Sequence, residues 1–272
     1  MVLEATAKDL ERIAYRVAGE TAGYLRDLYG IEELSEVIGR GASGDTTRRI
    51  DREVEDFAID LLVNSGLDLL IVSEERGIVK ASSSPRYIVL MDPLDGSLNY
   101  TLGIPAVAVS IVFYSVDEPY LCNAISGAVA NVFLREVISF DDRNVYIDRV
   151  RVPGYKPSKS GIAVIYTNDP EAFRIIHGFM HEAYTWSTRL RVLGSAALES
   201  VYAGLGRIDL FFHNTGRLRN LDVAGGIAVA RRLGAVATGL RGSLEGYRAD
   251  RIEFLNSLII GDKKVLGLRR LF

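Results

Sequence analysis

Apolar side chains in the first sixty residues follow helical spacing on either side of a glycine-rich segment. They recur every three or four positions through residues 3–29, which predicts an amphipathic helix that buries Leu3, Leu10, Ile13, Val17, Tyr24 and Leu28. The same spacing predicts a second helix over residues 51–63, with an inward face of Val54, Phe57, Ala58, Leu61 and Leu62. Between them, residues 39–45 (GRGASGD) are rich in Gly and Ser, so we expect a loop that can move.

After residue 63 the apolar positions gather into short runs separated by turn residues. Such runs are typical of a largely antiparallel sheet, here with strands over residues 69–73, 87–91, 107–114, 128–134 and 137–140. Residues 148–160 are rich in Pro, Lys and Ser, which indicates a boundary between an N-terminal lobe (residues 1–150) and a C-terminal lobe (residues 151–272).

The C-terminal lobe alternates between strand and helix patterns. Strands are predicted over residues 162–166, 189–193 and 208–212, and helices over residues 170–183, 196–203 and 223–233. This alternation favours an α/β fold for the second lobe, joined to an α+β first lobe.

The composition supports a sizeable core, since 48% of the 272 residues are apolar. The net charge of −3 and the dispersed basic residues give no global basic field that would recruit nucleic acid. The single cysteine, Cys122, excludes an internal disulfide and a multi-cysteine zinc site, and its apolar setting predicts a packed thiol. Only six of the 32 basic residues are Lys and Gln is absent, which fits either a heat-stable protein or a biased genome composition.

The N-terminal segment does not resemble a signal peptide, and no apolar stretch predicts a membrane span. The first twenty residues are amphipathic and contain acids, unlike the basic start and apolar segment of a signal peptide. No stretch of about 18 uncharged apolar residues is present, so we expect no membrane span and a cytoplasmic protein.

The segment MDPLDGSLNY, residues 91–100, carries the most chemistry. An apolar run delivers Asp92 and Asp95, with Pro93 stiffening the turn between them. Two carboxylates on one short turn suit a hard cation such as Mg²⁺, and the Gly96-Ser97 step offers backbone N–H groups to an anion. Together they predict metal-assisted hydrolysis of a phosphate ester. The alternative is a plain turn, for which the same residues are also favoured.

Other acidic residues stand at strand ends or beside turns: Asp45, Glu74, Glu75 and Asp222. Each has a simpler explanation, since Asp45 could cap a helix, the two Glu could end a strand in solvent, and Asp222 could be an N-cap. An α/β fold, however, gathers strand-end loops at one crevice, and a Mg²⁺ cluster requires converging carboxylates there.

These segments, in this order, resemble the inositol monophosphatase and fructose-1,6-bisphosphatase superfamily of Mg²⁺-dependent phosphatases. The resemblance rests on SGDTTRRID, IVSEERG, MDPLDGSLNY, GSAALES and LDVAGGIAVARRLGA, and it covers nearly the whole chain. The central segment matches the family's D-P-[IL]-D-G-[ST]-x-N, and LDVAGG matches its W-D-x-A-[AG]-G with Leu221 in place of Trp. The chain looks most like archaeal members that accept both inositol phosphates and fructose bisphosphate. The resemblance implies their layered αβαβα sugar-phosphatase fold.

The resemblance also implies a set of metal ligands. One Mg²⁺ would be held by Glu74, Asp92 and the carbonyl of Leu94, and a second by Asp92, Asp95 and Asp222. A third, weaker ion would lie near Glu74 and Asp45, and Mn²⁺ could substitute for Mg²⁺. Glu75 would support these ligands without binding metal itself.

The same resemblance assigns the phosphate and the attacking water. The backbone N–H groups of Gly96 and Ser97 would bind the phosphate, while Asp45, Thr47 and the Ser97 hydroxyl would orient a water activated by the metals. No covalent phospho-enzyme is required. Haloacid-dehalogenase enzymes do use an aspartate nucleophile, but their D-x-D-G-[ST] spacing and N-terminal position differ from the motif here.

The substrate is less closely defined. By resemblance, Ser195 and Ala196 approach the sugar ring, and the place of a ring-binding Glu is taken here by His213, which puts a preference for inositol in doubt. Arg191, Arg217 and Arg219 could bind a second phosphate, since arginine forks suit phosphate oxygens, or could be solvated loop charges.

We therefore predict a Mg²⁺-dependent phosphomonoesterase that hydrolyses fructose 1,6-bisphosphate and inositol 1-phosphate, with the bisphosphate slightly preferred. Alternatives are a 3′-phosphoadenosine 5′-phosphate or NADP(H) phosphatase, and a regulatory binding protein on the same fold. We expect a small-molecule substrate and, by analogy with the family, a homodimer.

Overall fold

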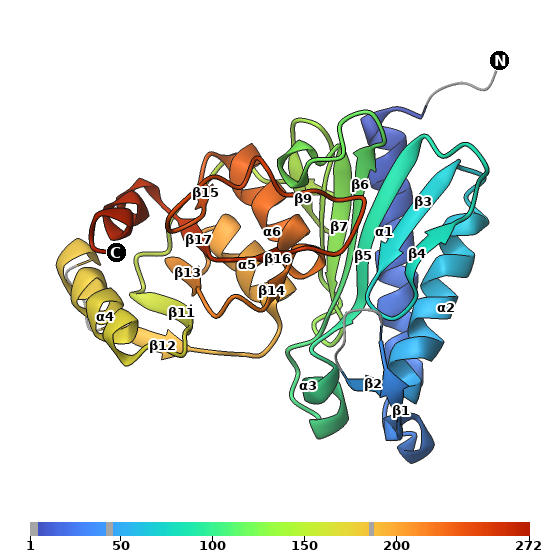
Figure 1. The fold of residues 1–272 in the computed structure, drawn as a ribbon, viewed down its shortest axis with the longest axis horizontal. Coiled ribbons are helices and arrows are strands. Elements are labelled where there is room, and N and C mark those ends of the chain that lie inside the picture. Colours follow the sequence, from blue (N-terminus) through green and yellow to red (C-terminus); the bar gives the residue numbers. More distant parts are fainter. Residues whose placement is uncertain (1–4, 42–45, 185–187) are drawn as a thin grey trace.

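A computed structural model describes residues 5–41, 46–184 and 188–272 of the chain. Helices and sheets alternate in layers (Figure 1), as the predicted αβαβα arrangement requires. The two outer layers are helical and each covers the far face of one sheet, while a central helical layer separates the sheets. Within these residues the α-helices are α1 (Ala7–Asp27), α2 (Arg49–Val63), α3 (Ser97–Leu102), α4 (Pro170–Tyr184), α5 (Ala196–Gly204) and α6 (Asn220–Leu233).

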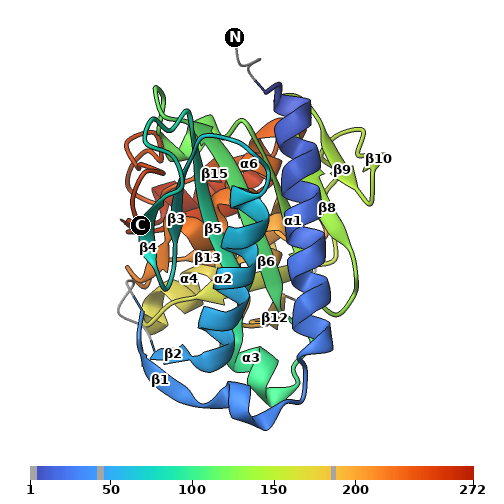
Figure 2. The ribbon, with the colours of Figure 1, turned by 90° about the vertical axis from the view of Figure 1, so that its right-hand side faces the viewer.

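The larger sheet has eight strands in the order β10-β9-β8-β7-β6-β5-β3-β4. Every neighbouring pair is antiparallel except β3 and β5, which confirms the largely antiparallel sheet. Helices α1 and α2 lie side by side across its outer face (Figure 2). Its strands are β3 (Leu69–Ser73), β4 (Gly77–Lys80), β5 (Tyr87–Asp95), β6 (Ala108–Ser115), β7 (Ser126–Asn131), β8 (Val137–Phe140), β9 (Val145–Ile147) and β10 (Val150–Arg151).

The smaller sheet has five strands in the order β12-β11-β13-β17-β15. Strand β11 is parallel to both β12 and β13, and helices α4 and α5 connect these strands as the predicted α/β alternation requires. Strands β13, β17 and β15 are antiparallel. The strands are β11 (Ile162–Tyr166), β12 (Arg189–Arg191), β13 (Leu210–His213), β15 (Val236–Thr238) and β17 (Leu258–Gly261).

Short elements complete the fold. Two small antiparallel pairs join β1 (Val37–Arg40) to β2 (Thr46–Arg48) and β14 (Leu218–Arg219) to β16 (Phe254–Leu255). The described parts of the chain also contain the 3₁₀ helices η1 (Glu32–Ser35), η2 (Leu121–Asn123) and η3 (Lys263–Arg270), the last beside α4. Among the described residues, no helix combines the length and apolar character needed to cross a bilayer.

The structure corrects the prediction of a loop over residues 39–45 at its beginning. Gly39 and Arg40 belong to β1 and pair with Thr47 and Thr46, while residues 42–45 lie outside the described residues. Glycine weakens a strand pattern because it brings no side chain to pack, so this short strand was read as a loop. Other short elements, among them α3, β4, β14 and β17, were also not predicted.

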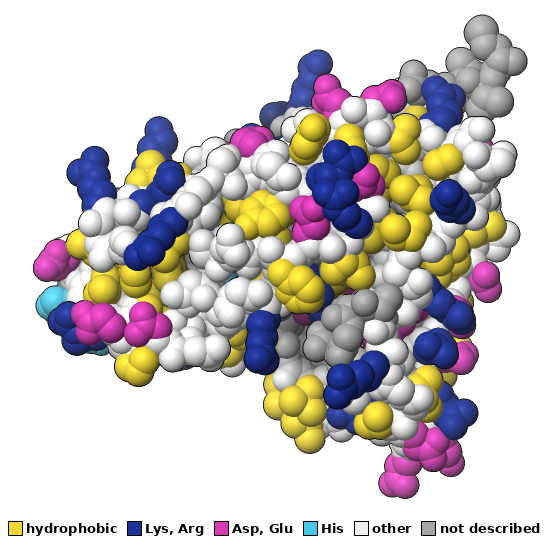
Figure 3. All heavy atoms as spheres, in the orientation of Figure 1, with side chains coloured by type: hydrophobic (Ala, Val, Ile, Leu, Met, Phe, Trp, Pro, Cys, Tyr) yellow, Lys and Arg dark blue, Asp and Glu magenta, His cyan; other side chains and the backbone are white. Residues whose placement is uncertain are grey.

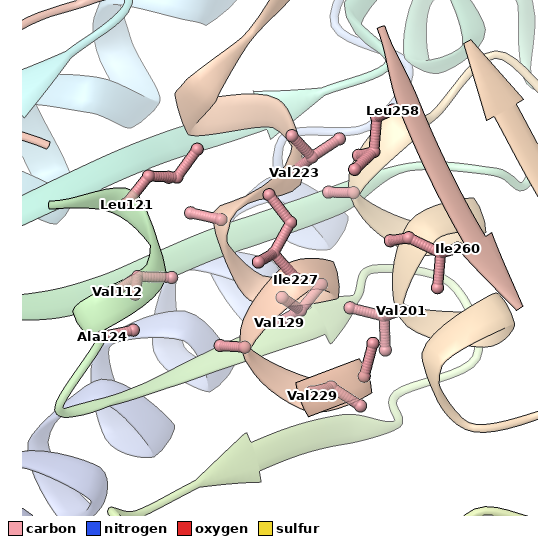
Figure 4. Packing of buried hydrophobic residues seen from close by; sticks show 14 of the residues in the cluster. Val112, Leu121, Ala124, Val129, Val201, Val223, Ile227, Val229, Leu258 and Ile260 are labelled. Carbon is pink, nitrogen blue, oxygen red and sulfur yellow. The ribbon is translucent and has the colours of Figure 1, made fainter. Parts of the chain in front are cut away.

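Helix α6 is the centre of the core. Eleven consecutive residues, 220–230, are buried, because α6 packs against α5, both sheets and η2 (Figure 4). A helix that is apolar all round belongs in such a position. Gly226 lets α5 approach closely, since a Cβ there would lie 2.8 Å from the carbonyl carbon of Ser200. This packing fixes the start of α6, where Asp222 lies.

The division of the chain into two lobes stays a prediction. The eight-stranded sheet takes its strands from residues 69–151 and the five-stranded sheet from residues 162–261, but α5 and α6 contact both sheets. On the face drawn in Figure 3, basic and acidic side chains are interspersed.

Candidate active site

Parallel pairing of β3 and β5 brings the first two acidic positions together. Ser73, the last residue of β3, pairs with Met91 of β5, so Glu74 and Asp92 follow at the same edge of the sheet. Both faces of β5 are covered by helices, and all nine of its residues are buried. A strand buried on both faces reads as a continuous apolar run, which is why Asp92 stands out in it.

A β-bulge places Asp95 beside Asp92. Asp92 pairs with Ser110 of β6 and Asp95 with Ala108, so β5 takes three steps where β6 takes two. In a regular strand, residues three apart face opposite sides, and the extra residue of a bulge reverses that. Pro93 lies within the bulge, where the missing N–H breaks no ladder bond. The Leu94 N–H donates to Asp92 Oδ1 at 3.0 Å and orients that carboxylate.

Asp222 reaches the same place from the first turn of α6. Ligand oxygens of Asp92, Asp95 and Asp222 all lie within 4.8 Å of one another, and all three residues are buried. Asp222 also caps its helix, because its Oδ2 accepts the N–H of Arg219 at 2.8 Å. Asp222 is therefore not the N-cap, which is Arg219, but the residue three positions later that accepts the N-cap N–H. Its predicted place in an acidic cluster is occupied as expected.

Burial and mutual repulsion raise the pKa values of the clustered carboxyl groups even with Arg219 among them. Burial, and then the neighbouring Asp222, raises the pKa of Asp95 to about 7. Burial raises the pKa of Glu74 to about 7 despite its ion pair with Arg219. Burial together with Glu74 and Asp95 raises the pKa of Asp92 well above its ordinary value. Binding of a metal ion would therefore displace protons from these carboxyl groups into solvent.

A divalent metal fits these residues. Asp92 Oδ2 is buried and has no hydrogen-bond partner among the described residues, so one oxygen is left for another ligand. Three converging carboxylates supply the hard oxygen donors that Mg²⁺ and Mn²⁺ prefer. Glu74 is linked to this group through Arg219, which binds both Glu74 and Asp222.

A glycine turn whose geometry suits an anion follows directly after Asp95. Gly96 is the N-cap of α3 and has a left-handed backbone with φ 91°. A Cβ at this position would lie 2.8 Å from the carbonyl oxygen of Ala106, so glycine is required twice over. The first N–H groups of a helix have no acceptor within the helix, and at α3 they lie next to the acidic cluster.

Ser195 contacts the acidic cluster. Its Oγ donates to Asp95 Oδ2 at 2.5 Å, and the Ala197 N–H at the start of α5 donates to the same oxygen at 2.8 Å. The sequence analysis placed Ser195 and Ala196 against the substrate ring. The structure turns the Ser195 hydroxyl towards a carboxylate, while Ala196 is the first residue of α5 and is half-buried.

The loop before α5 is held by residues that the sequence analysis did not assign. Glu199 accepts the Leu193 N–H at 2.6 Å and the Tyr166 hydroxyl at 2.5 Å. Asn99 of α3 donates to the Leu193 carbonyl at 2.6 Å and so ties this loop to α3. Glu199 is fully buried in α5, whose other residues are mostly small or apolar. An acid within such a mostly apolar helix is the sequence signal that could have identified it.

A second group of acids lies behind the cluster, at the start of α2. Thr47 is buried and donates its hydroxyl to Glu75, and Glu55 accepts the Glu75 N–H at 3.2 Å. Asp51, also buried, has a pKa that burial raises to about 7. The sequence analysis had not assigned Asp51 or Glu55, although buried acids four positions apart on one helix face are a recognisable signal. Asp45 lies outside the described residues.

The three candidate arginines separate in the structure. Arg219 is half-buried and lies within the acidic cluster, whereas Arg191 and Arg217 are exposed and form no ion pair within the described parts of the chain. His213 ends β13 and stacks on Tyr166 at 5.1 Å between ring centroids. Burial lowers the pKa of His213 to about 4, so its imidazole is neutral at neutral pH.

Comparisons with known proteins agree with this geometry. The Inositol monophosphatase family profile matches residues 7–267. The chain is 35% identical over 257 residues to an inositol-1-monophosphatase of Aeropyrum pernix, covering 93% of this chain and 92% of that protein. It is 31% identical over 259 residues to a fructose-1,6-bisphosphatase/inositol-1-monophosphatase of Thermococcus kodakarensis, covering 94% and 93%.

Solved structures extend the likeness to three dimensions. The crystal structure of an inositol monophosphatase–fructose 1,6-bisphosphatase matches with a TM-score of 0.77 and 25% identity, covering 94% of this chain and 96% of that one. With the family profile spanning almost the whole sequence and an acidic cluster suited to metal, the chain belongs to the inositol monophosphatase family of metal-dependent phosphatases.

Proposed function

We propose that this protein is a Mg²⁺-dependent phosphomonoesterase that hydrolyses fructose 1,6-bisphosphate and inositol 1-phosphate. The observation that carries the proposal is the convergence of Asp92, Asp95 and Asp222 directly beside the turn at Gly96, whose backbone N–H groups would bind phosphate. When bound, Mg²⁺ supplies Lewis-acid charge to the phosphoryl group and acidifies the attacking water.

The chain's own residues orient this site. The Leu94 N–H fixes Asp92, and the Ser195 hydroxyl with the Ala197 N–H fixes Asp95. The N–H groups at the start of α3 would hold the phosphate, and Thr47 holds Glu75 behind the site. A carboxylate fixed in this way does not have to reorganise when charge develops at phosphorus.

The bisphosphate is the better substrate in this proposal. His213 occupies the place that the family gives to a ring-binding Glu, and it is neutral at neutral pH. A neutral imidazole cannot supply the anionic acceptor for ring hydroxyls that a Glu would. Arg191 and Arg217 are exposed, so their guanidinium groups are open to a second phosphate.

The experiment is phosphate release from both substrates at matched concentrations, with Mg²⁺ and with EDTA, beside an Asp222→Asn control. We expect Mg²⁺-dependent turnover of both substrates, a higher kcat/KM for fructose 1,6-bisphosphate, and almost none with the variant. Turnover that persists in EDTA would refute the metal-dependent chemistry. If neither sugar phosphate is turned over, the substrate assignment is wrong and phosphorylated nucleotides become the next substrates to test.

We also propose further properties of the site and of the protein. They are two to three metal ions for each site, Leu94 as a carbonyl ligand, roles for Asp45 and the Ser97 hydroxyl in orienting water, a homodimer and a cytoplasmic location. Light scattering of the purified chain measures the oligomeric state, and metal analysis measures the number of ions bound.

A further inference from the structure

The Arg219 side chain lies inside the acidic cluster. Its guanidinium contacts Asp222 Oδ1 at 2.8 Å through Nη2 and at 3.0 Å through Nε, and it also donates to Glu74. Its Nη2 lies 3.9 Å from Asp92 Oδ2. Only 12% of the Arg219 side chain is exposed. One cation therefore bridges three of the four carboxylates that converge here.

These contacts compete with metal binding for the same oxygens. Both carboxylate oxygens of Asp222 already accept hydrogen bonds from Arg219, through the backbone N–H and through the guanidinium. A metal ion at Asp222 requires a lone pair that now points at the guanidinium. A metal ion bound at Asp222 and the guanidinium of Arg219 would also repel each other, because the site excludes most of the solvent that would screen their charges.

The structure also shows how the side chain could leave. The Arg219 backbone is fixed independently of its guanidinium, because it is the N-cap of α6 and pairs with Phe254 in β14–β16. Rotation about the side-chain bonds can therefore remove the guanidinium while the N–H bond to Asp222 and the start of the helix remain. A planar, always charged fork can bridge two carboxylates in this way, whereas Lys offers a single point charge.

We propose that Arg219 is a resident counter-cation of the acidic cluster, and that a divalent metal binds in exchange for its guanidinium contacts with Glu74 and Asp222. This inference rests on the proposed metal-dependent function. Arg219 keeps these carboxylates paired in the metal-free protein. It also weakens metal affinity, because each binding event must first break the arginine's ion pairs.

The test is Mn²⁺ binding to the metal-stripped full chain, with free Mn²⁺ followed by electron paramagnetic resonance. Arg219→Met removes the charge and keeps similar bulk, and we expect its dissociation constant for Mn²⁺ to be about tenfold lower than that of the wild type. Arg219→Lys should fall between them. Arg217→Met, the matched control that loses an exposed charge two positions away, should change the constant by less than about twofold.

Stability supplies a second readout. The metal-free Arg219→Met protein should melt at a lower temperature than the wild type, and saturating Mn²⁺ should remove most of that deficit. Unchanged or weaker Mn²⁺ binding by Arg219→Met would overturn the exchange, since a residue that merely positions Asp222 would lose affinity when removed.

Two further measurements keep the inference testable. If Arg219→Met does not fold, the Nε–H signal of Arg219 in the wild type, assigned with Arg219→Lys, should be protected in EDTA and move when Mg²⁺ is added. A signal unchanged by Mg²⁺ refutes the exchange. Asp95→Asn separates the two proposals: if the wild type and this variant bind Mn²⁺ equally, the metal site itself is wrong and the inference falls with it. If Asp95→Asn loses binding but Arg219→Met does not gain it, only the exchange is wrong.

Discussion

Replacing Asp92 by Asn should separate catalysis from folding. The side chain is 1% exposed, and an Asn oxygen can still accept the Leu94 N–H that Asp92 Oδ1 accepts at 3.0 Å. The other oxygen has no hydrogen-bond partner among the described residues, and in the variant an NH₂ group that cannot bind metal takes its place. The fold should therefore persist while the metal site is lost.

The expected magnitudes follow from charge and linkage. Losing a shared metal ligand should lower kcat/KM by about a thousandfold or more, equivalent to about 4 kcal/mol of transition-state stabilisation. In EDTA the variant should be as stable as the wild type or more stable, because neutral Asn removes a buried carboxylate whose pKa is already raised by burial, Glu74 and Asp95. With Mg²⁺ at about 100 times its dissociation constant, the wild type gains about 2.7 kcal/mol.

The assay is thermal unfolding in EDTA and in saturating Mg²⁺, together with phosphate release. For a domain of about 250 residues, the Mg²⁺ gain corresponds to a rise of about 5 to 10 °C in Tm for the wild type and none for the variant. The reasoning is refuted if Asp92→Asn retains more than about a tenth of the activity, or if Mg²⁺ raises its Tm as much as that of the wild type.

Three further predictions test other parts of the site. Ser195→Ala removes a 2.5 Å bond to Asp95, so kcat should fall about 10- to 100-fold with little change in KM; a raised KM with kcat intact would indicate substrate contact instead. Asp51 has a pKa raised to about 7, so it stabilises the fold below about pH 4 and that contribution is lost as the pH rises through 7. In urea unfolding with EDTA, the free energy of unfolding of Asp51→Asn should therefore rise relative to that of the wild type by up to about 1.4 kcal/mol per pH unit between pH 4 and 7. A difference that stays constant with pH would refute the raised pKa of Asp51. Gly96→Ala places a Cβ on a left-handed backbone, 2.8 Å from the carbonyl oxygen of Ala106. The free energy of unfolding should therefore fall by about 1–3 kcal/mol, and inorganic phosphate should no longer compete with substrate. Unchanged unfolding and unchanged competition would contradict this.

Strands and helices were predictable where the sequence carries a local period. Strand β3 and strand β11 match their predicted bounds, because each is a short apolar run between turn residues. The four-residue strand β17 was not predicted, although it pairs with β13 in the centre of the smaller sheet. Its position depends on pairing with distant strands, which leaves no local period to read.

The acidic residues were predictable, but their partners were not. The spacing of Asp92 and Asp95 indicated a turn, yet the bulge that aligns them appears only in the register with β6. Ser195 lies 100 positions from Asp95, and Arg219 lies 145 positions from Glu74. Contacts over such separations come from the packing of α5 and α6 between the sheets, which no short sequence window contains.

The most direct test of the central claim is a crystal structure of the chain soaked with Mn²⁺ and inorganic phosphate, with an anomalous difference map collected at the Mn edge. The account predicts a peak between the carboxylates of Asp92, Asp95 and Asp222, with phosphate at the N-terminus of α3 beside it. A map without anomalous density at these carboxylates, from crystals that bind Mn²⁺ elsewhere or not at all, would contradict it.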